Sequence, residues 1–261
     1  MYSVLLAHEE DHDGWRKNAR ALAAASVPAD RIEWRTGGAS DLFGGETLPP
    51  STAAPFAVPR AFLVLSRQAI CHSDPERFAL LYAMLLRLRD RTGAIADEAD
   101  PLVRRLGLMA KDVRRDMHKM HAFLRFREVE TDGLVRYVAW FEPDHHIVRS
   151  NAGFFVRRFA TMAWSILTPE LSIHWDRGTL AESRGAVRAD APDGDPIEAV
   201  WKTYYASIFN PARVKTRAML KEMPKKYWKN MPETGLVAPL VAGARARVEA
   251  MLEEETSPDR R

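Results

Sequence analysis

Four side chains able to transfer protons lie in two short stretches of the sequence. His118 and His121 are three residues apart, so they share one face of the helix that we expect there. Glu142 and His145 follow a strand-like stretch that ends at Phe141. If the strand end lies beside the helix end, imidazole and carboxylate groups meet. Such a group can run general acid–base catalysis, and these residues form our candidate catalytic set.

The same histidines allow other interpretations. Imidazoles beside carboxylates could bind a transition metal, could contact nucleic acid, or could only make structural hydrogen bonds. The spacing does not match the H-E-x-x-H pattern of zinc enzymes. His145 and His146 are adjacent, and on an extended chain they would point in opposite directions. We therefore predict no metal ligand, and we leave open whether the protein is an enzyme.

A basic and aromatic segment, residues 201–230, has the composition of a nucleic-acid contact. It holds eight Lys or Arg side chains and a single acid, Glu222. Cations neutralise phosphates, and flat rings stack on exposed bases for about 1–3 kcal/mol per base. The alternative is ordinary amphipathic helices, with the rings in the core and the cations in water. The residues expected to contact nucleic acid are Tyr204, Tyr205, Arg213, Lys215, Lys225, Lys226, Trp228 and Lys229.

Two other polar groups are given structural roles. Residues 8–13 (HEEDHD) look like metal or proton ligands, but a solvated loop between a strand and a capped helix is the favoured interpretation. Cys71 and His72 are interpreted as a helix end. Because Cys71 is the only cysteine, an intramolecular disulfide and a cysteine-only zinc site are excluded.

Several common enzyme motifs are missing from the sequence. It contains no G-x-x-x-x-G-K-[ST], no G-x-G-x-x-G, no G-x-S-x-G and no C-x-x-C pattern. ATP hydrolysis, dinucleotide redox chemistry and α/β-hydrolase chemistry are therefore poorly supported, and we predict no cofactor.

The positive charge of the chain is local. Residues 1–100 have a net charge of −3, residues 101–235 of +7, and residues 236–261 of −1. A polyanionic partner is therefore expected for the middle of the chain. No apolar run approaches the ~20 residues of a membrane span, and the N-terminus lacks the basic start of a secretory signal. We expect a cytoplasmic protein without membrane contact.

Hydrophobic periodicity predicts the elements of the first half of the chain. Strands over 2–7 and 31–35 flank a helix over 14–25, which makes a β-α-β unit with a parallel strand pair. Residues 36–59 are rich in Gly, Pro, Ser and Thr and are expected to form a long loop. Helices are then expected over 60–70, 74–91 and 100–121.

The second half of the chain is predicted to combine two hairpins with helices. The hairpins are expected over 122–128 with 134–141 and over 171–175 with 179–184. Helices are expected over 149–165, 196–209, 211–229 and 236–254. The predicted fold is therefore α+β and mostly helical, with an antiparallel sheet from the two hairpins covered by helices. The expected domains are residues 1–58, the β-α-β unit with its loop, and residues 59–261.

Three long stretches resemble a bacterial family called probable DNA metabolism protein. They are HKMHAFLRFREVE at 118–130, YVAWFEPDHHIV at 137–148 and NAGFFVRRFATMAWSILTP at 151–169. The resemblance continues through Trp175-Asp176 and the basic segment up to residue 233, and it covers roughly residues 60–245.

The resemblance implies a context rather than a reaction. Such proteins occur alone or fused ahead of a uracil-DNA glycosylase-like domain, and they are associated with a DNA-repair radical S-adenosylmethionine protein. Because this chain carries no glycosylase motif, we expect the stand-alone form without glycosylase activity. The resulting expectation is a DNA-binding accessory protein in DNA repair that acts with such a partner. The alternatives are a repair enzyme using the His/Glu set and a protein-interaction module that does not touch DNA.

Overall fold

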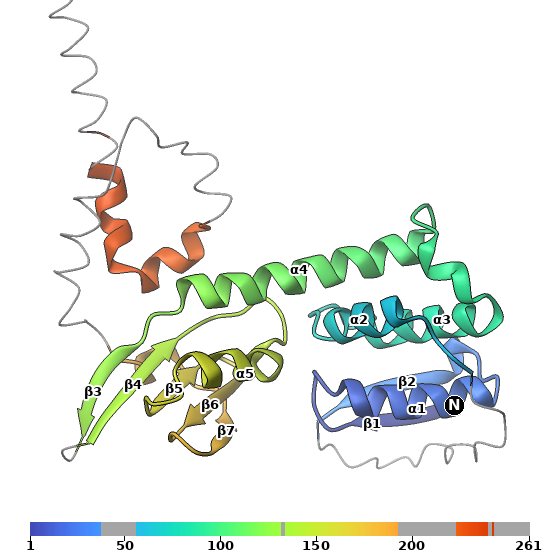
Figure 1. Cartoon of the computed structure of the whole chain (residues 1–261), viewed down its shortest axis with the longest axis horizontal. Helices are drawn as coiled ribbons and strands as arrows, with labels where there is room; N and C mark the ends of the chain where they lie inside the picture. The colour runs from blue at the N-terminus through green and yellow to red at the C-terminus, as the bar shows by residue number, and fades with distance from the viewer. Residues whose placement is uncertain (38–55, 132–133, 193–222, 240–241, 243–261) are drawn as a thin grey trace, which may run out of the picture. The chain divides into compact units, whose positions relative to one another are not determined.

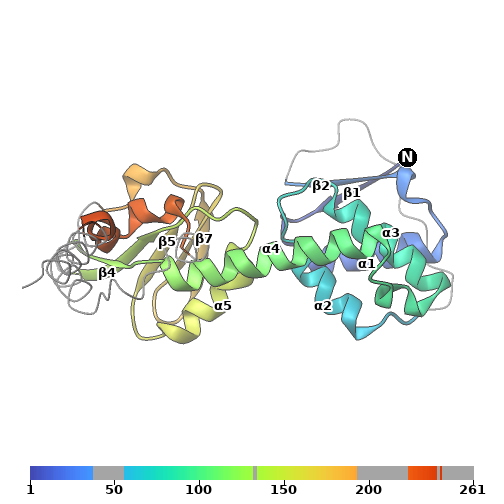
Figure 2. The same cartoon turned by 90° about the horizontal axis from the view of Figure 1, so that it is seen from above.

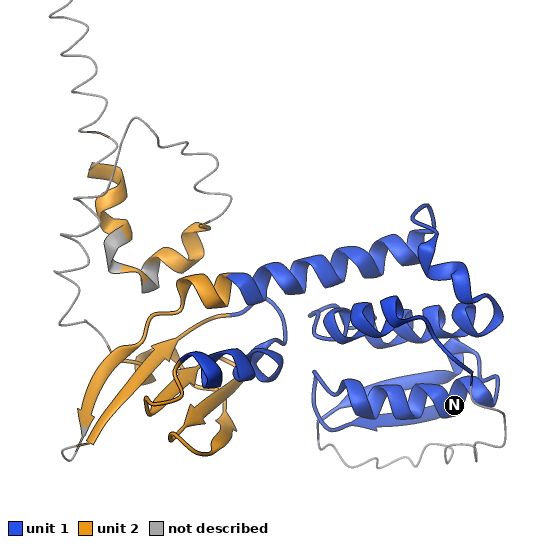
Figure 3. Ribbon diagram, in the orientation of Figure 1, with its two compact units in different colours: residues 1–118, 143–158 blue, residues 119–142, 159–261 orange. Residues whose placement is uncertain are grey.

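The fold is α+β, as predicted. The structure is a computed structural model that describes residues 1–37, 56–131, 134–192, 223–239 and 242. It divides into two compact units (Figure 3). The first unit comprises residues 1–118 with 143–158, and the second comprises residues 119–142 with 159–261. The domain boundary expected near residue 58 stays a prediction.

The first unit begins with the predicted β-α-β unit. Strand β1 (Tyr2–Leu6), helix α1 (His12–Ala24) and strand β2 (Ile32–Thr36) follow one another, and the two strands pair in parallel (Figure 1). Helix α1 begins at residue 12 because the Asp11 carboxylate accepts a hydrogen bond from the Gly14 backbone N–H at 2.8 Å. The helix buries Trp15, Ala19, Leu22 and Ala23.

Four α-helices follow along the chain near the positions that periodicity indicates. They are α2 (Arg60–Ala69), α3 (Arg77–Asp90), α4 (Pro101–Phe123) and α5 (Val148–Arg158). Helix α3 packs against α1, α2 and β2, and Figure 2 shows α1, α2 and α3 beside one another. Buried aromatic side chains stabilise this packing, and their N–H and O–H groups donate hydrogen bonds to backbone carbonyl oxygens. The Trp15 indole donates to the Phe78 carbonyl oxygen at 3.3 Å, and the Tyr82 hydroxyl donates to the Val27 carbonyl oxygen at 2.7 Å.

The second unit contains one five-stranded sheet with the strand order β3-β4-β5-β6-β7. The strands are β3 (Arg127–Thr131), β4 (Leu134–Trp140), β5 (Trp164–Leu167), β6 (Leu171–Trp175) and β7 (Leu180–Arg184). Strands β4 and β5 are parallel, and every other neighbouring pair is antiparallel. The two predicted hairpins are therefore present, joined by a central strand.

That central strand is the main error of the sequence analysis. The predicted helix 149–165 ends at Arg158, and residues 164–167 form β5. In β5, Trp164, Ser165 and Ile166 are all buried. A strand buried on both faces has no alternating pattern, so a short apolar run cannot be distinguished from helix by periodicity.

Two boundaries also differ from the prediction. Helix α4 runs on to Phe123, so β3 begins at Arg127 rather than at residue 122. Residues 225–230 form the 3-10 helix η5 (Lys225–Asn230) rather than the end of an α-helix. Pro224 precedes it, and proline has no backbone N–H for an α-helical hydrogen bond. Over the residues that the structure describes, no helix combines the length and the apolar character of a membrane span.

Candidate nucleic-acid interface

Strand pairing places the arginines of β3 and β4 and the glutamates of the strands on opposite faces of the sheet. Successive residues of a strand alternate between the two faces, and paired residues share a face. One face therefore carries the arginines of β3 and β4, and we call it the arginine face. Its strand positions are Arg127, Val129, Thr131, Leu134, Arg136, Val138, Trp140, Ser165, Leu167, Ser172, His174, Ala181 and Ser183.

The acids of the strands lie on the other side. Glu128 and Glu130 alternate with Arg127 along β3, and Glu182 pairs with Ile173. The opposite face also holds the buried apolar residues Ala139, Trp164, Ile166 and Ile173. Over the described positions of β3–β7, the arginine face therefore carries no Asp or Glu. Trp140, Ser165 and Ser172 on this face are buried, so anions can reach it at the exposed Arg136 and the half-buried Arg127.

Three arginines line a pocket beside this face. It is lined by Arg125, Arg127, Val138, Trp140, Arg188, Ala191 and Pro192, and the volume open to the centres of water molecules is about 10 Å³. Arg127 Nη1 donates to the Pro192 carbonyl oxygen at 2.6 Å, and Arg188 Nη1 donates to the Ala191 carbonyl oxygen at 3.3 Å. Arg125 Nη1 donates to the Ala122 carbonyl oxygen at 2.7 Å. Sequence reasoning missed this pocket, since Arg188 is distant in the chain and no local pattern links it to Arg127.

A chain of hydrogen bonds crosses the arginine face from β4 to β7. Arg136 Nη1 donates to Ser165 Oγ at 3.3 Å, and both nitrogens of His174 lie 2.8 Å from a serine hydroxyl, Ser165 on one side and Ser183 on the other. Because the Ser183 hydroxyl donates to the Arg184 carbonyl oxygen, His174 Nε2 donates to Ser183 and His174 Nδ1 accepts from Ser165. Burial lowers the pKa of His174, and the charge of Arg136 lowers it further. Both effects favour the neutral form of the imidazole.

The predicted basic segment is described only at its end. Lys225 and Lys226 are exposed there. The Trp228 ring is half-buried, and its indole N–H donates to the Met223 carbonyl oxygen at 3.0 Å. Tyr227 is 2% exposed and stacks on Phe141 with ring centroids 5.3 Å apart. This ring anchors the two lysines on the second unit. The side chain of Lys229 and the residues Tyr204, Tyr205, Arg213 and Lys215 lie outside the described residues.

The four predicted catalytic residues are divided between the two units. His118 and His145 lie in the first unit, and His121 and Glu142 lie in the second. His118 and His121 are exposed on α4, and Glu142 accepts a hydrogen bond from the Trp140 indole at 2.9 Å. Their convergence on one substrate stays a prediction. Over the described residues, no group of three or more His, Cys, Asp or Glu side chains is placed to hold a metal ion.

His145 instead lies beside His72 and Ser73, which the sequence analysis had placed in a separate segment. Its ring lies 4.2 Å from that of His72, and its Nδ1 lies 3.1 Å from Ser73 Oγ. Buried Asp116 accepts the backbone N–H of His145 at 3.0 Å and so fixes this loop. Burial lowers the pKa of His72, and the neighbouring His145 lowers it further. Hydroxyl and imidazole within hydrogen-bond reach form the pair that activates a serine nucleophile.

The acidic loop after β1 belongs to the same unit and is not simply solvated. Glu10 is 9% exposed, and its carboxylate accepts the backbone N–H groups of Arg149 and Ser150 at the start of α5. A carboxylate at a helix N-terminus is stabilised by the unpaired N–H groups there. Glu9 forms an ion pair with Arg77, whose side chain is 4% exposed. The expected cap at Asp11 is present. Glu9 and Glu10 have structural roles, because they bind Arg77 and the start of α5.

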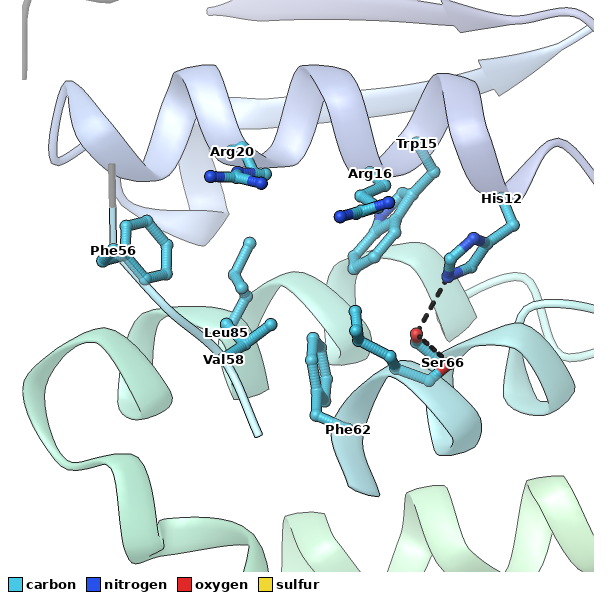
Figure 4. A pocket seen from close by; sticks show the side chains of 10 residues that line it. His12, Trp15, Arg16, Arg20, Phe56, Val58, Phe62, Ser66 and Leu85 are labelled. Atoms are coloured by element: carbon cyan, nitrogen blue, oxygen red, sulfur yellow. Dashed lines mark hydrogen bonds between the residues drawn. The ribbon is translucent and has the colours of Figure 1, made fainter. Parts of the chain in front are cut away.

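A second hollow, in the first unit, has no room for a substrate. It is lined mainly by apolar side chains, including Trp15, Phe56 and Phe62 (Figure 4). The volume open to the centres of water molecules is about 20 Å³, which holds one water or two. At its rim His12 Nε2 lies 2.9 Å from Ser66 Oγ. We place the candidate interface on the second unit because the arginine face there separates the arginines of β3 and β4 from the strand glutamates.

A comparison with protein families gives one result. The family model described as a domain of unknown function, DUF4130, matches residues 75–233. The match spans more than half of the 261 residues. The chain belongs to this family. No curated protein matches the chain, and neither does any solved structure.

The region matched by DUF4130 contains the whole arginine face. It also contains Lys225 and Lys226, the pocket arginines and His145. Glu9, Glu10 and His72 lie outside it, although their partners Arg77, Arg149 and His145 lie within it. The candidate interface is therefore a feature of the family region.

Proposed function

We propose that this DUF4130 protein is a nucleic-acid-binding accessory protein in bacterial DNA repair or metabolism. The observation that carries the proposal is the arginine face, where the guanidinium groups of Arg127 and Arg136 share one side of a sheet and the strand glutamates occupy the other. Phosphate contacts supply most of the affinity of proteins for nucleic acids, and arginine matches phosphate with paired hydrogen bonds. The family resemblance in sequence supports DNA as the nucleic acid.

Lys225 and Lys226 support a second set of phosphate contacts in the same unit. Both side chains are exposed, and the buried Tyr227 ring between Phe123 and Phe141 holds their backbone in place. A cation held at a fixed position loses less conformational entropy on binding than one on a mobile chain. We assign these lysines to sequence-independent binding of the phosphate backbone.

From the resemblance we also propose a partner protein that acts on the bound DNA. A glycosylase-like protein or a radical S-adenosylmethionine protein would carry out the repair reaction, and this chain would hold the strand. Copurification of such a protein from a bacterial lysate is expected to require DNA or to strengthen when DNA is added. Copurification with a partner but no DNA binding at low salt would favour the protein-interaction module.

A salt-titrated binding assay with single-stranded, duplex and uracil-containing DNA tests the proposal. Binding should weaken steeply with salt, and the Lys225→Ala/Lys226→Ala variant should lower the slope of log K against log salt by about 1.4 on single strands if both lysines contact phosphates. The matched control is Lys17→Ala/Lys111→Ala, which removes two exposed lysines from the first unit. Equal effects of the two variants would refute a localised contact.

A second candidate function is a repair enzyme, favoured by the Ser73 hydroxyl beside His145. In this role His145 would accept the Ser73 proton as Ser73 Oγ attacks the phosphorus of a phosphodiester. The bond from phosphorus to the oxygen of the departing strand would break, and His145 would return the proton to that oxygen. Incubation of abasic and uracil-containing DNA with wild-type protein and with Ser73→Ala tests it. Cleavage that persists in the variant, or no cleavage by either protein, would exclude this role.

A further inference from the structure

We propose that the far end of the β3–β4 hairpin binds duplex DNA and inserts Leu134 as a wedge between neighbouring base pairs. We call this end the β-arm and define it as residues 129–131 and 134–136, which pair with one another. The inference rests on the proposed function. It adds the form of the bound DNA and the contact that distorts it, while Arg136 of the arginine face supplies a phosphate contact beside the wedge.

The β-arm extends past the pairing that builds the rest of the sheet. Strand β4 begins at Leu134, but its pairing with β5 begins at Tyr137. In the register that the structure describes, residues 134–136 therefore pair with β3 alone, and Figure 1 shows β3 and β4 side by side. At about 3.4 Å per residue, they extend about 10 Å beyond the β5 pairing. The grooves of duplex DNA accept β-strands of this kind.

The β-arm exposes two adjacent apolar side chains. Leu134 is 72% exposed, the highest value among the exposed large apolar side chains of the described residues. Val135 follows it on the opposite face and is 46% exposed. The other described side chains of this kind occur singly along the chain. Contiguous apolar surface that is left in water marks an interaction site.

Side-chain contacts hold the β-arm at its base. Tyr137 pairs with Glu128 across the two strands, and its hydroxyl donates to the Glu128 carboxylate at 3.1 Å. Arg136 Nη1 donates to Ser165 Oγ on β5 at 3.3 Å. An isolated pair of strands is only marginally stable, so a wedge that opens a base stack needs such support. These contacts connect the β-arm to the five-stranded sheet.

The charges of the β-arm favour a nucleic acid as its partner. Arg136 is exposed and lies two residues after Leu134, so both side chains share a face. Glu130 pairs with Val135 on the other face. The face of Leu134 therefore attracts phosphates, whereas the opposite face repels them. The contact of Arg136 with Ser165 uses one nitrogen of a group that has five N–H donors, which leaves donors for a phosphate.

An apolar side chain beside a cation is the combination that distorts duplex DNA. Leucine can enter a base step, partly unstack the two base pairs and kink the helix. The cost of this opening is smallest where a base is mismatched or damaged. The β-arm therefore favours a duplex with a weakened base pair over a fully paired one, and it places the chain where a repair partner acts.

Fluorescence anisotropy with two duplexes that differ by a single mismatch tests the inference. Each duplex carries, beside that position, a fluorescent adenine analogue whose emission rises when it is unstacked. We expect wild type to bind the mismatched duplex at least about 10-fold more tightly and to raise the emission of both duplexes. Leu134→Ala should lose the preference and the rise, whereas Leu134→Met, which keeps a bulky apolar side chain, should retain them.

The matched control is Leu180→Ala. It removes an exposed leucine from the opposite face of the sheet in the same unit and should behave as wild type. Because Leu134 is exposed, Leu134→Ala should leave the thermal unfolding of the protein unchanged. A lost mismatch preference is then an effect on DNA binding and not on folding.

The outcomes separate this inference from the proposed function. Equal binding of both duplexes with steep salt dependence, or an unchanged preference in Leu134→Ala, would overturn the wedge and leave DNA binding in place. A dimer in sedimentation that Leu134→Ala converts to a monomer would assign the apolar end of the β-arm to a contact between copies, and would also overturn the wedge. No binding to any DNA at low salt would refute the proposed function and this inference together.

Discussion

Removal of the charge on Glu9 should destabilise the first unit in a pH-dependent way. Arg77 is 4% exposed, and Glu9 is its ion-pair partner. Loss of one member of a fully buried pair costs about 3–5 kcal/mol because the other charge stays buried and unpaired. Since the Glu9 side chain is 38% exposed, water screens part of this interaction. We expect Glu9→Gln to lower the free energy of unfolding by about 1–2 kcal/mol at pH 7.

The pH dependence follows from the pKa of Glu9. Burial alone would raise this pKa, but the hydrogen bond from Thr36 and the charge of Arg77 outweigh burial and hold the pKa below its ordinary value of 4.5. A depressed carboxyl pKa contributes stability above the ordinary value, and that contribution disappears as the pH falls through the folded-state pKa. The difference between wild type and Glu9→Gln should therefore be full at pH 7 and shrink below pH 4.5.

Urea unfolding at a series of pH values measures this difference. The matched control is Glu33→Gln, because Glu33 forms an exposed ion pair with Arg35 at 3.1 Å. An exposed pair is worth about 0–1 kcal/mol, so the control should change stability little at any pH. A constant difference for Glu9→Gln between pH 3.5 and pH 7, or one no larger than that of the control, would refute the reasoning.

Three further outcomes test other parts of the structure. Because burial lowers the pKa of His174, its NMR titration midpoint should lie below the ordinary 6.5. The stability contributed by the neutral imidazole should be lost as the pH falls from 6.5 through that midpoint, and a midpoint above 6.5 would contradict the burial of the ring beside Arg136. Tyr227→Ala should cost about 3 kcal/mol in unfolding free energy and weaken DNA binding, whereas unchanged stability in thermal unfolding would show that the ring is no anchor. Burial raises the pKa of Cys71 to about 12, so a thiol reagent at pH 8 should modify it only after unfolding, and rapid modification of folded protein would contradict its burial.

Local sequence patterns predicted the helices that have a regular apolar stripe and a capping residue. Helix α1 followed from the spacing of Trp15, Ala19 and Leu22 and from a capping residue before it. Helix α4 followed in the same way from its apolar stripe. Strand β5 did not, since burial on both faces removes the alternation that identifies a strand.

The candidate interface depends on pairings that a single sequence does not display. Arg127 and Arg136 share a face because β3 and β4 pair in one register, and a slip of one residue would exchange Arg127 with Glu128. His174 meets Ser165 only because β5 lies between β4 and β6. The sequence did show a positive middle region. The strand order and register decide which of these cations share a face.

The most direct test of the central claim compares the arginine face with other exposed arginines of the same unit by salt-titrated binding of single-stranded DNA. The Arg127→Gln/Arg136→Gln variant removes two charges from the arginine face, and Arg177→Gln/Arg184→Gln removes two exposed charges elsewhere in the same unit. We expect the first variant to weaken binding and to lower the salt slope by about 1.4, while the second stays close to wild type. Equal losses in both variants, or a loss only in the second, would contradict DNA binding on the arginine face.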